Sequence, residues 1–371
     1  MILVDNFENQ LQEYWQGKIN NIPTASTMVN HIMELRKNRL NKFNYQLRYR
    51  IEKNTSFNPH HSQFGDAKYD VTVVQDHIFL TRAIFKGDKL IQNKKENKIL
   101  FTHVESLIQK SPDESEIINC PNCGAPQSIA AIRTGCQFCG THFEMTDIYP
   151  SVSLVFFLDD YALSKNNMET TSGKVQTIAK GYLNLFKLFS QIPDVVEKVK
   201  DGALSSNKVF EEFMCQYRPD FSFQQFGDAA LSMFLVYLFS DEPNNLPFIN
   251  IENCPVLEPT LVDYDYKNGG ISVVKDSCKI NGDFATVDVL FYINEYYDDR
   301  GSLRLANNKY CVSLKRNINA PVDFGFSFTK INCPSCGAVF DALKNCNCPY
   351  CSTRYQMKGE DWTITDIKKL R

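Results

Sequence analysis

The sequence lacks the features that most directly assign a protein to a functional class. Its 40 Lys and Arg residues are nearly balanced by 43 Asp and Glu residues, and the formal net charge of -3 leaves no global basic field to attract nucleic acid. The longest apolar run, residues 229–239, is shorter than the roughly 18 residues that span a bilayer. The start of the chain has neither the basic nor the apolar segment of a secretory leader. We therefore expect a soluble, cytoplasmic protein.

Signatures of catalysis are missing as well. The chain contains no nucleophile elbow, phosphate-binding loop, HExxH sequence or dinucleotide-binding fingerprint. Histidine is scarce, its six positions show no metal-ligand spacing, and none lies beyond His142. An enzyme that needs an Asp–His pair could therefore take its histidine only from His77 or His103. We expect a protein without enzymatic activity.

The residues that are plentiful indicate a globular protein with more than one domain. A chain of 371 residues exceeds one ordinary domain, and two or three are expected. The composition is 43% hydrophobic and 22% charged, as in folded soluble proteins. With 27 Phe and 17 Tyr, each domain can bury a core of its own.

Two cysteine clusters of nearly identical sequence divide the chain into similar halves. The first reads CPNCGA at residues 120–125 and CQFCG at 136–140, and the second reads CPSCGA at 333–338 and CPYC at 348–351. Paired CxxC turns are typical of structural zinc sites, in which four thiolates complete a tetrahedron and leave no position for a substrate. The ligands predicted for two zinc ions are Cys120, Cys123, Cys136, Cys139, Cys333, Cys336, Cys348 and Cys351.

Several details of the clusters follow from the same comparison. Gly124 and Gly337 come directly after a ligand and are expected to adopt the left-handed conformation that turns the chain. Cys346 is a fifth candidate in the second cluster, but alignment with the first cluster favours Cys348. An iron–sulfur centre and a disulfide pair are the alternatives to zinc, and both fit small duplicated ribbons less well.

The scattered cysteines are expected to be buried free thiols: Cys215, Cys254, Cys278 and Cys311.

In both halves the spacing of apolar residues is first that of a helix and then that of a strand. Apolar residues from Phe7 to Ile19 recur at helical spacing, with Asp5 and Glu8 as a capping box, and a second helix is predicted to start near Thr24. Alternation around residues 47–51 begins a strand-rich section. A strand over 151–158 and a helix over 175–199 follow the first cluster.

The second half repeats this order. Residues 222–240 predict a helix, and an Asn-Gly turn between the runs 271–280 and 283–296 predicts a hairpin. Residues 303–314 predict a further strand before the second cluster.

Helices followed by antiparallel strands are the order of an α+β protein. The sequence predicts a first α+β domain over 1–112, a first zinc ribbon over 117–149, a strand and connecting helices over 150–205, a second α+β domain over 206–325, a second zinc ribbon over 329–358 and a C-terminal tail over 359–371.

A basic stretch in the first half offers a candidate surface for a partner. Aromatic residues are interleaved with six of its cations: Arg36, Lys37, Arg39, Lys42, Arg48 and Arg50. A peripheral anionic membrane is one candidate partner for such a patch. The simpler interpretation, a solvated helix face followed by the outer face of a strand, is favoured.

The order of helix, antiparallel strands and CPxCGA ribbon resembles a family of bacterial zinc-ribbon proteins. Their core domain is similar to the C-terminal domain of subunit 44 of the mitochondrial inner-membrane translocase. The matching residues are the two cysteine clusters and the segment 361–365, which resembles the family's strand after the ribbon. The resemblance implies two cone-shaped domains like the nuclear transport factors, with helices packed on a curved antiparallel sheet. It also implies a non-enzymatic adaptor that binds proteins or anionic lipid.

The predicted function is therefore a zinc-stabilised adaptor or scaffold that binds a protein or lies at a membrane surface, with nucleic acid an unlikely partner. A small-molecule or lipid carrier is the alternative, with a pocket walled by Phe226, Phe234, Phe284 and Phe291. An enzyme of the same fold is less favoured.

Overall fold

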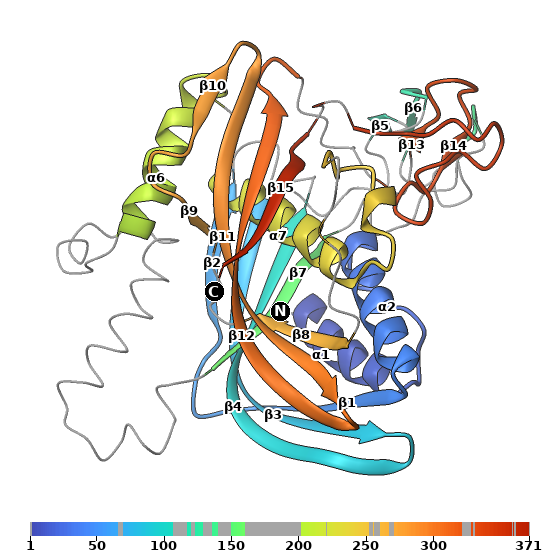
Figure 1. Cartoon of the computed structure of the whole chain (residues 1–371), viewed down its shortest axis with the longest axis vertical. Coiled ribbons are helices and arrows are strands. Elements are labelled where there is room, and N and C mark those ends of the chain that lie inside the picture. Colours follow the sequence, from blue (N-terminus) through green and yellow to red (C-terminus); the bar gives the residue numbers. More distant parts are fainter. Residues whose placement is uncertain are drawn as a thin grey trace.

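The computed structural model contains two antiparallel sheets, each covered by helices, and confirms an α+β protein (Figure 1). It describes residues 2–65, 70–106, 117–119, 123–128, 136–139, 150–159, 202–219, 221–251, 255, 260–266, 271–320, 328, 331–357, 359 and 361–370. The helix predicted over 175–199 lies outside these residues.

The first sheet has the strand order β1-β3-β4-β7, and β2 also pairs with β3. Its elements are α1 (Ile2–Trp15), α2 (Thr27–Lys42), β1 (Tyr45–Lys53), β2 (His60–Gly65), β3 (Asp70–Lys86), β4 (Lys89–Ser106) and β7 (Ser151–Asp159). Every strand pair in it is antiparallel.

The second sheet has the order β10-β11-β12-β15, and β8 and β9 also pair with β11. Its elements are α6 (Gly202–Cys215), α7 (Phe223–Phe239), the short helix η3 (Pro243–Asn245), β8 (Leu261–Tyr266), β9 (Ser272–Val273), β10 (Lys279–Asn281), β11 (Phe284–Asp299), β12 (Ser302–Asn317) and β15 (Thr363–Leu370). The hairpin predicted at Asn281-Gly282 is confirmed: Asn281 pairs with Phe284, and Gly282 has a φ of 60°.

The strand that follows each cysteine cluster returns to the sheet that precedes it. β7 pairs with β4, and β15 pairs with β12, both antiparallel. In chain order each cluster is therefore inserted between the last two strands of its sheet. The segment 359–371, expected to be a tail, supplies an edge strand over residues 363–370 because its alternating apolar side chains complete the second core. The predicted domain boundaries are otherwise untested and stay predictions.

A second repeat holds these returning strands in place. Residues 20–26 read NNIPTAS and residues 244–250 read NNLPFIN. Ala25 forms a parallel bridge to Val152 at the start of β7, and Ile249 forms the same bridge to Ile364 at the start of β15. This match makes α1 and α7, which precede the two segments, equivalent helices. α2, which follows the first segment, is then an addition to the first half.

Local signals explain where the helices begin. Ser26 accepts a hydrogen bond from the backbone N–H of Val29 and caps α2, and Ser222 accepts one from Gln225 and caps α7. The capping box predicted at Asp5 and Glu8 is wrong, because α1 already begins at Ile2. Both carboxylates instead lie near the ammonium group of Lys53 on β1, at 2.6 Å and 3.2 Å.

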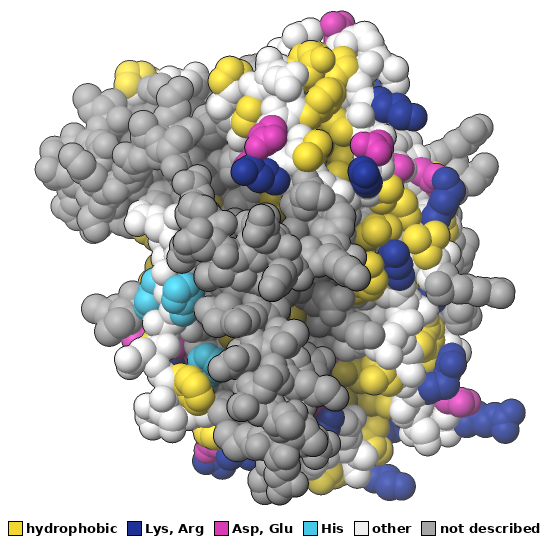
Figure 2. Space-filling view, turned by 90° about the vertical axis from the view of Figure 1, so that its left-hand side faces the viewer, with side chains coloured by type: hydrophobic (Ala, Val, Ile, Leu, Met, Phe, Trp, Pro, Cys, Tyr) yellow, Lys and Arg dark blue, Asp and Glu magenta, His cyan; other side chains and the backbone are white. Residues whose placement is uncertain are grey.

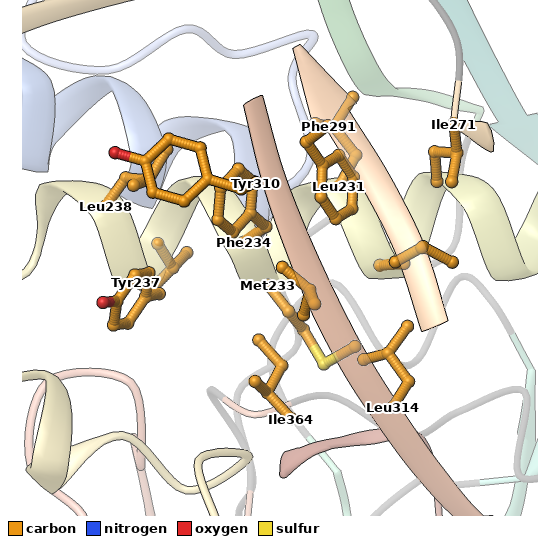
Figure 3. Close-up of a cluster of buried hydrophobic side chains, with 14 of the residues drawn as sticks. Leu231, Met233, Phe234, Tyr237, Leu238, Ile271, Phe291, Tyr310, Leu314 and Ile364 are labelled. Atoms are coloured by element: carbon orange, nitrogen blue, oxygen red, sulfur yellow. The ribbon is translucent and has the colours of Figure 1, made fainter. Parts of the chain in front are cut away.

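Two apolar clusters form the core, and the larger one draws side chains from both sheets, among them Phe101 of β4, Leu154 of β7 and Phe234 of α7. The first half buries Phe7, Leu11 and Trp15 of α1 together with Leu47 and Tyr49 of β1. The helical spacing in α1 and the alternation in β1 predicted this burial. In the second half, Phe234 of α7 stacks on Phe291 of β11 with ring centroids 4.4 Å apart, and Tyr310 of β12 meets it edge-on at 5.2 Å (Figure 3).

Buried polar contacts join the two halves. Arg36 of α2 makes a two-pronged ion pair with Asp263 of β8: Nε lies 2.6 Å from Oδ1 and Nη2 2.9 Å from Oδ2. The side chains are only 10% and 8% exposed. Arg39, one turn further along α2, donates to the carbonyl oxygens of Phe239 and Ser240 at the end of α7. A guanidinium group thus satisfies carbonyls that the helix end leaves free.

Replacing Arg36 with Met should lower the free energy of unfolding by about 3–5 kcal/mol, because the buried Asp263 carboxylate loses its partner. Denaturant unfolding measures this loss. Arg50→Met is the matched control: Arg50 pairs with Glu52 at the surface at 2.8 Å, and such a pair is worth about 1 kcal/mol or less. The double variant R36M/D263L should recover most of the loss. Equal losses for R36M and R50M would contradict the role of the buried pair.

The carboxyl of Glu8 should make stability depend on pH. Burial raises its pKa to about 8, although the nearby ammonium of Lys53 opposes the shift. The folded protein therefore keeps a proton that the unfolded chain loses near pH 4.5, so the free energy of unfolding should fall as the pH rises from about 5 to 8. Glu8→Gln should remove this part of the slope in urea titrations at several pH values. An unchanged slope in that variant would refute the assignment.

Candidate metal centres

The second cysteine cluster is built from two similar turns. β13 (Ile331–Asn332) and β14 (Val339–Phe340) form a small hairpin, at whose turn the N–H of Gly337 donates to the carbonyl of Cys333. In the other turn the N–H of Ser352 donates to the carbonyl of Cys348. Gly337 and Ser352 occupy the same place after a ligand and have φ angles of 73° and 60°. The left-handed conformation predicted for Gly337 is confirmed, and here Ser352 adopts it without being glycine.

The sulfur atoms of this cluster are spaced for a tetrahedral metal ion. The Sγ atoms of Cys333, Cys336, Cys348 and Cys351 all lie within 4.8 Å of one another. Cys333 and Cys351 are 3.4 Å apart, and Cys336 and Cys348 are 3.7 Å apart. A tetrahedron with metal–sulfur bonds of about 2.3 Å has sulfur–sulfur edges of about 3.8 Å. A disulfide would need about 2.05 Å, so this geometry fits a metal centre.

The structure separates Cys346 from this group. Its side chain is buried and free, and it is not among the four sulfurs that converge. Its carbonyl accepts a hydrogen bond from the N–H of Tyr355 and holds the second turn against the chain. The positions of the sulfur atoms thus favour Cys348 over Cys346, as the alignment of the two clusters does.

The first cluster has the same geometry in its described part. The Sγ atoms of Cys123, Cys136 and Cys139 converge, with 3.7 Å between Cys123 and Cys136. The N–H groups of Phe138 and Cys139 both lie 3.4 Å from the sulfur of Cys136, an arrangement that stabilises a thiolate. Gly124 has the predicted left-handed φ of 70°. The fourth predicted ligand, Cys120, lies outside the described residues.

Hydrogen bonds prepare one thiol of the second cluster for metal binding. The hydroxyl and backbone N–H of Thr353 lower the pKa of Cys351 to about 6. The backbone N–H of Ala338 also lowers the pKa of Cys336, but hydrogen bonds among the neighbouring sulfurs outweigh it and raise that pKa to about 12. A metal ion would supply positive charge that stabilises the thiolate forms of both residues.

The second ribbon is fixed to the second sheet. Leu343 and Met357 are buried in the core that α7 and β11 form. The N–H of Met357 donates to the carbonyl of Pro247, and Arg354 donates to the carbonyl of Asn244, at 3.0 Å and 2.6 Å. Both acceptors belong to the repeated NNLP segment. The metal site thus lies in a loop whose two ends enter the same core, as a structural site requires.

Each ribbon presents one aromatic side chain to solvent at the same place in its motif. Phe138 stands between Cys136 and Cys139 and is 70% exposed, and Tyr350 stands between Cys348 and Cys351 and is 74% exposed. These are the most exposed large hydrophobic residues in the described part of the chain. Sequence reasoning missed them, although the repeated Cys-x-[Phe/Tyr]-Cys pattern could have identified them.

The cations of the basic stretch are largely engaged within the protein. Arg36 and Arg39 are buried, as described above. Lys42 pairs with Asp241 at 3.0 Å, and Arg50 pairs with Glu52. Lys37 lies over the ring of Tyr14 and Arg48 over that of Phe85, at 4.7 Å in each case. Arg36 and Arg39 therefore contribute no exposed charge to a surface patch.

The residues predicted for a pocket do not surround a common cavity. Phe226, Phe234 and Phe291 are buried in the second core, and Phe284 at the start of β11 lies apart from them beside a surface hollow. One of the two histidines named for an Asp–His pair does form one. Nδ1 of His103 lies 2.9 Å from the carboxylate of Asp228 on α7, and this buried pair joins the two halves. His77 instead stacks on Phe57 at 4.4 Å.

No protein-family model, curated protein or solved structure matches this chain. The resemblance to bacterial zinc-ribbon proteins therefore stays an expectation, which rests on cysteine spacing and on the order of elements. The coarser features are established: two α+β units with antiparallel sheets, and two cysteine groups able to hold metal ions. No helix in the described ranges is long and apolar enough to cross a membrane.

Replacement of Cys348 with alanine should lower the metal content, whereas replacement of Cys346 should not. Cys348→Ala should lose about one metal ion per chain, because three thiolates cannot complete the tetrahedron. Cys346→Ala should keep the full content, since its sulfur lies outside the group. Elemental analysis of the purified variants measures both. A loss of metal in C346A with none in C348A would reverse the assignment.

Proposed function

We propose that this chain is a non-enzymatic adaptor, stabilised by two structural zinc ions, that binds a protein partner through the tips of its two ribbons. The observation that carries the proposal is the pair Phe138 and Tyr350, exposed at equivalent positions of the two metal turns. Exposed aromatic side chains cost solubility when they have no partner, and aromatic anchors dominate binding energy in protein interfaces.

Zinc is the ion that suits the donor set best. Four thiolates without a nitrogen or oxygen ligand favour a borderline-soft cation. Zinc is such a cation, and it has no preferred coordination geometry that would oppose a tetrahedron. Cys333, Cys336, Cys348 and Cys351 would hold one ion, and Cys123, Cys136 and Cys139 would hold the other together with Cys120. Closed coordination of this kind stabilises a fold and does no chemistry on a substrate.

The charge of the ribbon favours a protein over a polyanion. Between residues 331 and 357 the charged side chains are Asp341, Lys344 and Arg354, and Asp341 faces Lys344 at 3.8 Å. Figure 2 shows basic side chains separated by acidic and hydrophobic ones over the described part of one face. Nucleic acid and anionic lipid select clustered cations, whereas Arg36 and Arg39 of the basic stretch are buried in contacts within the protein. A neutral, apolar pocket on a protein is the complement of an exposed Phe or Tyr.

Photo-crosslinking in the native host tests this function. A benzophenone amino acid at position 138 or 350 should crosslink to the same protein, whereas one at Leu305 should not. Leu305 is the matched control, because it is 52% exposed on β12, away from the ribbons. A Tyr350→Ser/Phe138→Ser double variant that keeps two zinc ions should lose the partner.

Crosslinks only to lipid or RNA, or equal labelling at position 305, would refute the proposal. Fewer than one zinc ion per wild-type chain would refute the metal assignment independently.

A further inference from the structure

A hollow of about 300 Å³ lies where the second ribbon rejoins the second sheet. Five separate segments line it: the NNLP segment, the starts of β11 and β15, the end of β12 and the end of the ribbon. The lining residues are Asn250, Phe284, Lys315, Gln356, Met357, Gly359 and Thr363. The hollow is distinct from both metal centres and from the aromatic tips.

The walls of the hollow are fixed by the backbone. Gly359 has a φ of 110°, and a Cβ atom there would lie 3.1 Å from the ring of Phe284 and 3.3 Å from the backbone nitrogen of Asn317. Its carbonyl accepts a hydrogen bond from that same nitrogen at 3.1 Å. Only glycine fits this close approach, so the ribbon end is held against the sheet in one position.

Among the described residues of the lining, Lys315 is the one that carries a charge. Lys315 holds its ammonium group 4.1 Å from the centre of the Phe284 ring, and it takes part in none of the ion pairs formed in the described ranges. Gln356 donates to the amide oxygen of Asn250 at 3.4 Å, so the amide nitrogen of Asn250 is left to donate elsewhere. Thr363 donates its hydroxyl to the carbonyl of Lys315. The free donors of the hollow are thus an ammonium and an amide.

We propose that this hollow binds a small organic monocarboxylate. The carboxylate would accept hydrogen bonds from Lys315 and Asn250, and its apolar part would lie beside Phe284. One cation matches one negative charge, whereas a phosphate dianion usually needs more positive charge or several backbone N–H groups. The volume suits a ligand of about the size of benzoate. This site does not depend on the proposed adaptor function.

Titration of the zinc-loaded full chain with benzoate, followed by NMR chemical shifts, tests the site. We expect saturable shifts confined to the lining residues, and no such shifts with benzamide, which has the same shape without the charge. Lys315→Gln should raise the dissociation constant about tenfold or more, because a charge-assisted hydrogen bond is lost. Inorganic phosphate should bind more weakly than benzoate.

Lys309→Gln is the matched control. Lys309 lies on the same strand and over an aromatic ring, that of Tyr292 at 5.3 Å, but outside the hollow. The Lys309→Gln variant should leave benzoate binding unchanged. Circular dichroism and metal content should show that both the Lys315→Gln and the Lys309→Gln variants are folded. No saturable binding, equal binding of benzamide, or equal binding to the K315Q variant would each overturn the proposal.

Discussion

The ion pair between Arg36 and Asp263 is a buried polar contact between two halves that also share an apolar core. Arg36 belongs to α2, the helix that the first half has in addition to the repeated elements, and Asp263 lies on β8 of the second sheet. A charged pair buried this deeply is weak evidence for stability, but the loss of either partner leaves an uncompensated buried charge. The added helix thus takes part in the contact of one unit with the other. Arg39 extends the same contact to the end of α7.

The two metal centres act on a different part of the fold. Each cysteine cluster interrupts its sheet between the last two strands, so the chain must return from the ribbon to the correct edge. A metal ion held by these cysteines would keep each ribbon compact, and the repeated segments 20–26 and 244–250 bridge to the returning strands through Ala25 and Ile249. A compact insertion lowers the entropic cost of closing the sheet. Phe138 and Tyr350 are exposed at equivalent places in the two clusters.

Much of the site could be predicted from residue types and spacing. The CxxC pairs identified the four converging thiols of the second cluster and three of the first, and the choice of Cys348 over Cys346 followed from alignment of the two copies. The helix beginning at Ser222 and the Asn281-Gly282 hairpin followed from local hydrogen-bonding preferences, whereas the second helix, expected to start near Thr24, begins at Thr27 after its cap Ser26. The capping box at Asp5 failed because α1 already begins at Ile2, and both carboxylates lie near Lys53, which is distant in sequence. The exposed aromatic tips were overlooked because the spacing of ligands says nothing of what the residues between them face.

The sequence by itself determined the two similar units, the α+β order and the cysteines that converge, because these depend on periodicity and short spacing within a few turns of chain. Only the tertiary structure decided where long-range partners lie: that the basic residues Arg36 and Arg39 are buried between the halves, and that β7 and β15 return to their sheets. It also brought five distant segments together around Lys315. The physical reason is that burial and ion pairing depend on which surfaces meet, and no local pattern specifies the surface of a segment two hundred residues away.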